Sequence, residues 1–276
     1  MEKFKHKLKS PVISLLTDFG TRDYFVGTMK GVILSIYPEA KIVDITHEVS
    51  PFNIMEAAFI LKNSYNYFPE GTVHLVVVDP GVGSERGIVI VKSRKYTFVA
   101  PDNGVLTYIY FTEEEFSIYR LNEKKILSEQ PASRTFHGRD IMAPIAARLA
   151  KGETPEEFGD PIDRFKVFNF YPSSFQKGTI NGAIIYIDKF GNLISNISED
   201  FFDRMCTRTG RKKIKIKCGD HEVSDTVPSY SKGKKNAISA IWASHGNLEI
   251  FVREGNASKK LKIKTGDKVT ISFIRN

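Results

Sequence analysis

The segment from Val73 to Gly87, VHLVVVDPGVGSERG, constrains the fold more than any other part of the chain. Its first residues form a short apolar run that is rich in valine and has no polar alternation. Such a run predicts a strand buried on both faces, as in a parallel sheet covered by helices. One proline and three glycines follow, and they allow the backbone to turn sharply and to approach a ligand. Because ligands of open α/β sheets bind beyond the carboxyl ends of strands, we expect Asp79 and Arg86 to face a site.

Four further segments also place an Asp or a His beside a Gly. They are Thr17–Gly20, Pro101–Gly104, Thr135–Asp140 and Asp188–Asn192. Three of these four, like the segment above, directly follow a strand-like run. A single turn of this kind indicates only a surface loop, whereas five of them predict a shared pocket.

The order of sequence patterns predicts the fold of the first half of the chain. Strand-like runs at 12–16 and 41–46 alternate with helical patterns at 23–37 and 53–65, before the strand that begins at Val73. This strand–helix alternation is typical of a parallel sheet covered by helices. A hairpin over 88–92 and 96–100 and a helix over 141–150 follow. We therefore predict an N-terminal α/β domain with a mainly parallel sheet over residues 1–167.

A change in character near residue 165 predicts a second domain. Residues 168–180 are aperiodic and contain Pro, Ser and aromatic residues, which is typical of a linker. Beyond it, short β-like runs are separated by turns, and no convincing long helix is visible; the runs cover 180–187, 193–197, 212–217, 237–242, 248–252 and 261–273. This pattern predicts a C-terminal antiparallel β domain, barrel-like in form, over residues 181–276.

Composition narrows the class of protein. The 276 residues contain no apolar run near the length of a membrane span, and we expect neither membrane association nor a signal peptide. Two cysteines without a CxxC pattern favour reduced thiols in the cytoplasm. The net charge of +8 could attract nucleic acid. However, lysines alternate with apolar residues at 213–217 and 260–264, as in half-solvated strands, so we predict no nucleic-acid partner.

Asp79, Arg86 and His137 form the candidate catalytic set. Asp79 could pair with His137 and fix its tautomer, so that the imidazole polarises a water molecule. Arg86 cannot lose its proton, and its expected role is to stabilise a hydroxide-like nucleophile by charge. The set is suited to activating water without a metal ion. From the residues alone, a buried structural network is the alternative interpretation, and it is the more common one.

Other catalytic chemistries find little support. The acidic turns and His137 loosely resemble a binuclear metal site, but none of the six histidines forms an HxH or HExxH pattern. We therefore predict no metal. No GxGxxG, Walker or GxSxG motif occurs either.

Matched motifs along nearly the whole chain give a more specific indication. They are LLTDFGTRDYFVG, VDITHEVSPFNI, FPEGTVHLVVVDPGVGSERG, APDNGVL, EQPASRTFHGRD, IDKFGNLISNI and HGNLEIFVREGNAS. Together they resemble the S-adenosyl-L-methionine (SAM) hydroxide adenosyltransferases, or SAM hydrolases, which are relatives of the fluorinases and chlorinases. The resemblance implies an N-terminal α/β domain and a C-terminal antiparallel β domain. It also implies a homotrimer that binds SAM where one subunit's N-terminal domain meets a neighbour's C-terminal domain.

The resemblance also implies the residues that hold the ribose and the methionine part of SAM. Asp18 matches the carboxylate that holds the ribose hydroxyls, and Phe52 matches an aromatic residue that packs on the sugar. The positions that hold the methionine ammonium and carboxylate groups are matched by Asp23, Asp188 and Ser244. SAM is the substrate, and no cofactor is implied.

The adenine end is matched by residues of the second half of the chain. Phe190 and Asn192 match the adenine-binding pair, and Glu249 and the backbone near Val252 lie in the matching C-terminal segment. For Phe190, as for Phe52, ordinary core packing is the alternative interpretation.

Differences from the halogenases indicate the hydroxide branch of the family. Halogenases have Tyr where this chain has Asp79, Thr where it has Val82, and Tyr and Ser where it has His137 and Gly138. They also carry an extra loop where residues 92–96 form a tight connection. Each difference favours water over halide as the nucleophile.

We therefore predict hydrolysis of SAM to adenosine and L-methionine, with water attacking the ribose C5′ carbon near Asp79, Arg86 and His137. Two alternatives remain open, namely a SAM-dependent halogenase and a SAM- or adenosine-binding sensor with negligible turnover. At His245 the chain departs from the halogenases, which have an Arg in contact with the methionine carboxylate. The role of His245 is left open.

Overall fold

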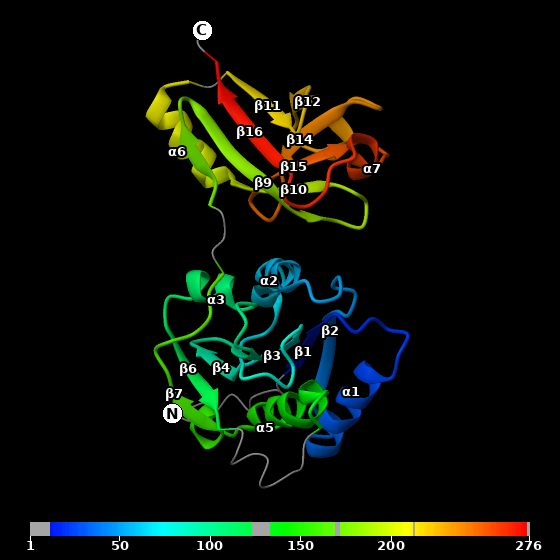
Figure 1. The fold of residues 1–276 in the computed structure, drawn as a ribbon, viewed down its shortest axis with the longest axis vertical. Coiled ribbons are helices and arrows are strands. Elements are labelled where there is room, and N and C mark those ends of the chain that lie inside the picture. Colours follow the sequence, from blue (N-terminus) through cyan, green and yellow to red (C-terminus); the bar gives the residue numbers. More distant parts are fainter. Residues whose placement is uncertain (1–11, 123–132, 169–171, 212, 275–276) are drawn as a thin grey trace, which may run out of the picture. The chain divides into compact units, whose positions relative to one another are not determined.

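The computed structural model describes residues 12–122, 133–168, 172–211 and 213–274 (Figure 1). Contacts divide the chain into two compact units, residues 1–168 and 169–276. The expected linker at 168–180 includes β8 (Ser174–Gln176), which pairs with β9 of the second unit. Within the described residues, every helix is too short or too polar to span a membrane.

A seven-stranded sheet forms the centre of the N-terminal unit, in the order β2-β1-β3-β5-β4-β6-β7. The strands are β1 (Val12–Thr17), β2 (Lys41–Thr46), β3 (Val73–Val77), β4 (Ile88–Ser93), β5 (Thr97–Pro101), β6 (Phe116–Leu121) and β7 (Gly159–Pro161). β2, β1, β3 and β5 run parallel. β4 and β5 form the expected antiparallel hairpin, and β6 pairs antiparallel to β4 and so runs in the direction of β5. The prediction of a mainly parallel sheet is confirmed.

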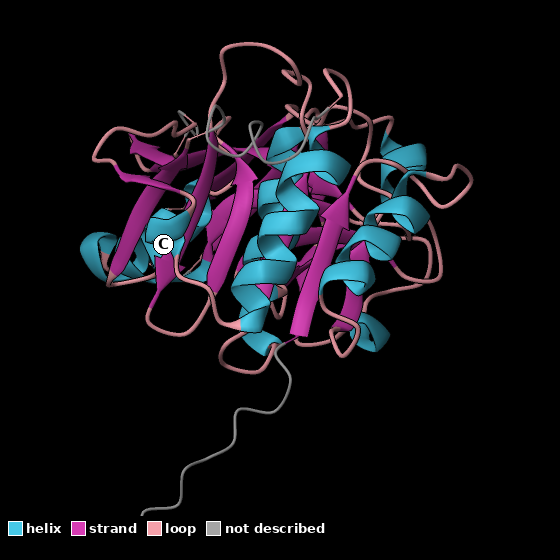
Figure 2. Ribbon diagram, turned by 90° about the horizontal axis from the view of Figure 1, so that it is seen from below, coloured by secondary structure: helices cyan, strands magenta, loops and turns pink. Residues whose placement is uncertain are grey.

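Helices cover both faces of this sheet. They are α1 (Phe25–Ile36), α2 (Ile54–Lys62), α3 (Thr107–Thr112) and α5 (Ala143–Lys151), together with the short turns η1 (Tyr65–Tyr67), η2 (Gly138–Met142) and η3 (Pro155–Glu157). α1 and α5 pack on one face, which Figure 2 shows from the front, and α2 and α3 pack on the other. The three expected helices exist. α1 and α2 are a few residues shorter than their sequence patterns, whereas α5 begins after the expected start at 141 and ends one residue beyond the expected end at 150.

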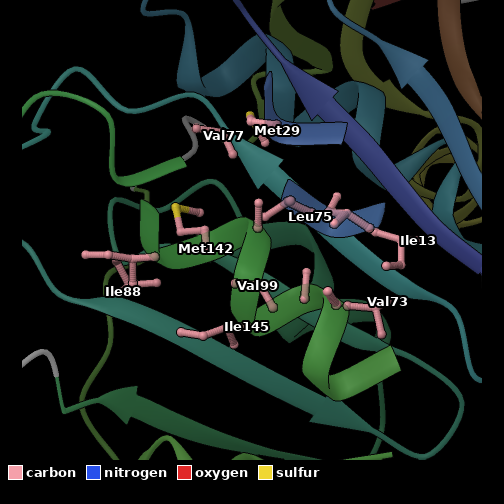
Figure 3. Packing of buried hydrophobic residues seen from close by; sticks show 14 of the residues in the cluster. Ile13, Met29, Val73, Leu75, Val77, Ile88, Val99, Met142 and Ile145 are labelled. Atoms are coloured by element: carbon pink, nitrogen blue, oxygen red, sulfur yellow. The ribbon is translucent and has the colours of Figure 1, made fainter. Parts of the chain in front are cut away.

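Side chains of β3 explain why its sequence is apolar without alternation. Val73, Leu75 and Val77 point to the side of α1 and α5, where they pack in the cluster shown in Figure 3. Val76 and the following Val78 point to the side of α2 and α3. Both faces of the strand are therefore in the core, and the residues that follow β3 leave the sheet at the carboxyl end of this central strand.

His74 is a polar exception in the middle of β3. It is fully buried, its Nδ1 lies 2.6 Å from the hydroxyl of Ser14, and its ring stacks on Phe98 at 5.0 Å. Burial lowers the pKa of His74 to about 3. The imidazole therefore stays neutral in the folded protein over the whole physiological range.

This histidine should make the stability of the fold sensitive to acid. Between the unfolded pKa of about 6.5 and the folded pKa of about 3, the unfolded chain binds a proton that the folded chain does not. The free energy of unfolding should therefore fall by about 2 kcal/mol between pH 7 and pH 5 because of this group. Urea unfolding at both pH values checks this against His74→Phe, which should lack that share of the loss. Equal losses in both proteins would contradict the assignment.

A nine-stranded sheet forms the C-terminal unit. In addition to β8, its strands are β9 (Thr179–Ile187), β10 (Leu193–Ser198), β11 (Ile214–Cys218), β12 (His221–Val223), β13 (Asp225–Thr226), β14 (Ile238–Trp242), β15 (Asn247–Val252) and β16 (Lys268–Phe273). All pairs are antiparallel except the short β13–β14 pair. β12, at one end of the strand order, packs near β14, which is next to the strand at the other end, so the sheet nearly closes. The antiparallel, barrel-like prediction is confirmed.

The expectation of a second half without a long helix is wrong. Residues Glu199–Thr209 form the eleven-residue helix α6. Ser198 caps its first turn by accepting the backbone N–H of Phe201 at 3.2 Å, and Gly210 ends it in a left-handed conformation. The run expected at 261–273 is also interrupted, because α7 (Ala257–Leu261) ends inside it and only β16 is a strand.

Candidate active site

A glycine-rich loop carries Asp79 away from the end of β3. The backbone N–H of Ser84 donates to the carbonyl of Gly81 at 3.0 Å, which closes a tight turn. Gly83 has a φ of +77°, and a Cβ at this position would lie 2.7 Å from the carbonyl oxygen of Arg134. Glycine is thus required here, because the chain passes close to the backbone of a distant segment in a left-handed conformation.

Asp79 and Arg86 form a buried ion pair across this loop. Arg86 Nε donates to Asp79 Oδ1 at 3.0 Å and to Oδ2 at 2.8 Å, and Nη2 donates to Oδ2 at 2.5 Å. The side chains are only 6% and 9% exposed, respectively. Charge-assisted bonds of this fork-like kind fix both the position and the orientation of the guanidinium group.

His137 joins this pair through Arg86. Arg86 Nη2 lies 3.0 Å from His137 Nδ1, and because a guanidinium can only donate, Nδ1 is the acceptor. The hydrogen of the neutral ring therefore sits on Nε2. We expected a pairing of Asp79 with His137; in the structure the bond that connects them runs through the guanidinium group.

One cavity of about 260 Å³ brings four of the predicted residues together. It is lined by Asp18, Phe52, Asp79 and His137, and by apolar residues that include Val82. Its walls come from segments that follow β1, β2 and β3 and from the segment that leads into η2. The expectation that separate Asp-Gly and His-Gly segments share a pocket therefore holds for three of them within the N-terminal unit.

Asp18 is held at the rim of this cavity by the backbone of Phe52. The Phe52 N–H donates to Asp18 Oδ2 at 2.8 Å. Burial raises the pKa of Asp18, the bond from Phe52 opposes this, and the charge of Asp79 adds to the rise, so that the net direction is upward. A carboxylate in this setting would gain from a ligand that donates hydrogen bonds to it.

Phe52 itself is unusual in two ways. Its side chain is 70% exposed, and its φ of +66° lies in the left-handed region that non-glycine residues seldom adopt. Core packing, the alternative interpretation of Phe52, is therefore wrong. Met55, one turn further along, is also exposed.

In the C-terminal unit, Asp188 organises the turn that contains the predicted adenine-binding residues. Its Oδ1 accepts the backbone N–H groups of Phe190 at 2.9 Å and Asn192 at 2.8 Å, and its Oδ2 accepts the Asn192 side-chain amide at 2.9 Å. Gly191 has a φ of +85°, and a Cβ there would overlap the side chain of Asn256. The motif Asp-Lys-Phe-Gly-Asn is therefore a tightly fixed turn.

This turn borders a second cavity, of about 590 Å³. Asp188, Phe190 and Asn192 line it on one side, and Tyr230 and Val252 are also among its lining residues. Phe190 is 74% exposed, so core packing is wrong for this residue as well. An open cavity with an exposed aromatic ring and an amide is suited to a flat heteroaromatic group.

Glu249, which the resemblance places in the segment that binds the adenine end of the substrate, is almost completely buried. Its side chain is 4% exposed; one oxygen accepts the hydroxyl of Tyr230 at 2.8 Å, and the other lies 3.3 Å from His245 Nε2. The N–H of Asn247 donates to His245 Nδ1 at 3.2 Å, so the ring hydrogen is on Nε2 and points to Glu249. Tyr230, which lines the cavity, was missed because no motif marks it in the sequence.

Two of the predicted residues lie on exposed turns. Asp23 precedes α1, and Ser244 lies in the turn between β14 and β15. Neither is among the described residues that line the two cavities, so their contacts with substrate stay a prediction. In the described part of the chain, no group of three or more His, Cys, Asp or Glu side chains is placed to hold a metal ion. Chemistry without a metal likewise stays a prediction.

Comparison with known families identifies the class of protein that this fold and these cavities define. The family described as SAM hydroxide adenosyltransferase N-terminal domain matches residues 13–159, and the corresponding C-terminal domain matches residues 182–270. The chain therefore belongs to the SAM hydroxide adenosyltransferase family.

Individual relatives match over most of their length. A protein of Methanocaldococcus jannaschii named (R)-S-adenosyl-L-methionine hydrolase is 37% identical over 273 residues, covering 95% of this chain and 96% of the relative. A Thermus thermophilus protein of the same name is 31% identical and covers 92% and 96%. A fluorinase of an Actinoplanes species is 29% identical and covers 68% and 72%. Among solved structures, an uncharacterized conserved protein of Thermotoga maritima superposes with a TM-score of 0.86 at 35% identity, covering 94% and 99%.

Proposed function

We propose that this protein hydrolyses SAM to adenosine and L-methionine. The observation that carries the proposal is that Asp79 and His137, which Arg86 connects by hydrogen bonds, line one cavity together with Asp18, in a chain that belongs to the SAM hydroxide adenosyltransferase family. The cluster is suited to holding a water molecule next to a positive charge. The residues that distinguish halogenases are absent from this sequence, which has Asp79, Val82 and His137 at those positions.

In the proposed reaction, the oxygen of water forms a bond to the ribose C5′ carbon while the C5′–S bond breaks. The electron pair of that bond passes to sulfur, which converts the sulfonium into the neutral thioether of methionine. The carbon next to a sulfonium is already electrophilic, so the protein has to orient the water in line with the leaving sulfur and exclude bulk solvent. The protonated 5′-hydroxyl that forms is a strong acid and releases one proton.

Three side chains divide the work. Arg86 supplies the positive charge that favours a hydroxide-like oxygen, and His137 donates from Nε2 to that oxygen. Asp79 fixes Arg86 and carries the carboxylate that accepts the released proton. His137 acts as a donor in this scheme, because its Nδ1 faces a guanidinium group.

The remaining predicted residues would bind the substrate. Asp18 accepts hydrogen bonds from the ribose hydroxyls, and Phe52 covers the sugar. Adenine would lie in the second cavity against Phe190 and Asn192, with Val252 in its wall. Glu249 would act indirectly, because its carboxylate accepts a hydrogen bond from the hydroxyl of Tyr230, which lines the second cavity. The methionine end is assigned to Asp23, Asp188 and Ser244 by resemblance alone.

Product analysis tests the proposed function. Purified protein is incubated with SAM, with and without a chelator, in buffers that contain or lack fluoride and chloride, and the adenosine-containing products are separated by chromatography. Adenosine formed at equal rates in all buffers is the expected result. A halide-dependent 5′-halogenated nucleoside would make the protein a halogenase. If SAM raises the melting temperature but no product forms, the sensor alternative holds.

We further propose that the complete site forms between subunits of a homotrimer, located in the cytoplasm. The first cavity belongs to the N-terminal unit and the second to the C-terminal unit. A partner subunit would supply the half that each unit lacks. Cys206 and Cys218, which are not joined in a disulfide, are compatible with a reducing compartment.

Mixing two inactive variants tests the shared site. Arg86→Ala impairs the first cavity, and a protein with both Phe190→Ala and Asn192→Ala impairs the second. Random co-assembly of the two in equal amounts would give about a quarter of all sites two intact halves, if each site takes its halves from different subunits. We therefore expect about a quarter of the wild-type rate after co-expression. A mixture that stays as inactive as the separate variants would show that both halves come from one chain.

A further inference from the structure

The turn Pro101–Gly104 is a motif that the proposed reaction leaves without a role. It follows β5, the neighbour of β3 in the sheet, and its sequence is Pro-Asp-Asn-Gly. Asp102 and Asn103 are the residues of this turn that could take part in chemistry, yet the cavity beside His137 is lined by other residues. Their hydrogen bonds lead instead to the backbone on either side of the catalytic loop.

Asn103 holds the point where that loop begins. Its Nδ2 donates to the carbonyl oxygen of Val78 at 2.9 Å, and Val78 immediately precedes Asp79. Its Oδ1 accepts the backbone N–H of Val105 at 3.1 Å, so the carboxamide is fixed at both ends. The carboxamide therefore ties the end of β3 to the turn after β5.

Asp102 holds the point where the loop ends. Its backbone N–H donates to the carbonyl oxygen of Gly87 at 2.8 Å, and Gly87 immediately follows Arg86. Two adjacent residues of one turn therefore form hydrogen bonds with the backbone at the two ends of the segment that runs from Asp79 to Arg86.

The turn is itself anchored. Asp102 is buried, and its carboxylate accepts Arg120 Nη2 at 2.8 Å and the backbone N–H of Lys166 at 2.8 Å. Arg120 also lies directly against Gly87, where a Cβ would come within 2.7 Å of the Arg120 Nε. The bond from Asp102 to Gly87 is thus part of a larger hydrogen-bonded network that includes Arg120 and the backbone of Lys166.

We propose that Asn103 is a positioning residue for the Asp79–Arg86–His137 site. The fork-like pair of Asp79 and Arg86 requires a fixed separation of the two loop ends, and Asn103 sets one of them. When this bond is lost, the end of β3 can shift, and the guanidinium no longer meets both Asp79 and His137 at bonding distance. Misplacement of a catalytic group by about 1 Å can cost roughly 100-fold in rate.

The test uses the substitution Asn103→Asp. Its kinetic measurements rest on the proposed SAM hydrolysis. This substitution keeps the size of the side chain and the acceptor for Val105, but it replaces the donor to Val78 with an acceptor. We expect kcat to fall about 10- to 100-fold while KM for SAM changes less than about threefold. In a background of Arg86→Lys, the same substitution should have little further effect, because both changes act on one pair of groups.

Asn63→Ala is the matched control, since Asn63 makes the same kind of bond, from Nδ2 to the carbonyl of Phe59 at 2.8 Å, at the end of α2. It should lower stability without changing kcat. Hydrogen exchange gives a readout that does not depend on activity. In Asn103→Asp, amides of residues 79–87 should exchange at least about fivefold faster than in the wild type and in the control.

The outcomes separate the two proposals. If the wild type forms no adenosine from SAM, the proposed function fails, and faster exchange in 79–87 alone still supports positioning. If exchange in this loop is unchanged, the positioning role is overturned whatever the rate. A kcat within twofold of the wild type, or full additivity with Arg86→Lys, overturns it as well.

Discussion

Arg86→Ala is expected to lower kcat for SAM hydrolysis by about 10²- to 10³-fold while the protein still binds SAM. The guanidinium is the group that Asp79 and His137 share, through bonds of 2.5 and 3.0 Å. Its removal takes away the positive charge beside the attacking oxygen and releases the His137 ring from its fixed tautomer. Steady-state kinetics with adenosine detection, together with SAM binding by calorimetry, check the two halves of this expectation.

The variant also leaves the buried Asp79 carboxylate without its partner, which can cost about 3–5 kcal/mol of stability. His137→Ala avoids that problem, because it leaves the Asp79–Arg86 pair intact. It should lower kcat by about 10²-fold with a melting temperature close to that of the wild type. Rates unchanged in a folded His137→Ala and a folded Arg86→Ala would remove the proposed mechanism.

Asp18→Asn is expected to raise KM for SAM by roughly 10- to 100-fold, the equivalent of one or two hydrogen bonds to a charged acceptor. The substitution keeps an oxygen that can accept the N–H of Phe52, so the strained backbone at Phe52 stays supported. Only the charge that would hold the ribose hydroxyls is lost. Substrate titrations check the prediction. An unchanged KM in the variant would show that Asp18 does not bind the ribose hydroxyls.

The pKa of Asp18 adds a pH dependence to this prediction. Burial, opposed by the Phe52 N–H and helped by Asp79, raises that pKa above the usual range for aspartate. The charged form that binds SAM is therefore lost at a higher pH than for an exposed aspartate, and KM should begin to rise as the solution is acidified. In Asp18→Asn this rise should be absent, which separates it from the titration of other groups.

Much of the N-terminal unit could be predicted because its signals are local. A continuous apolar run buried on both faces and the alternation of strands and helices determined the sheet around β3. β6 (Phe116–Leu121) was not identified, since its pairing with β4 depends on residues far away in the chain. α6 was missed although Ser198 and Gly210 mark its ends, because it directly continues the strand β10 and is followed closely by the strand β11.

The candidate site shows the same limit. Asp-Gly and His-Gly turns located Asp18, Asp79 and His137, because strand ends of a parallel sheet meet at one edge. The order of contacts, with Arg86 between Asp79 and His137, could not be read from the sequence. Nor could the role of Tyr230, because its hydrogen bond to Glu249 links two residues that are nineteen positions apart in the chain.

Hydrolysis in water enriched in ¹⁸O tests the central claim most directly. If water attacks the C5′ carbon, the adenosine formed from SAM must carry one heavy oxygen at its 5′ position, and methionine must carry none. Mass spectrometry of both products distinguishes this from every route in which another bond to sulfur breaks. The account predicts complete labelling of adenosine in the wild type and almost no product with His137→Ala. Unlabelled adenosine, or labelled adenosine formed equally well by His137→Ala, would contradict it.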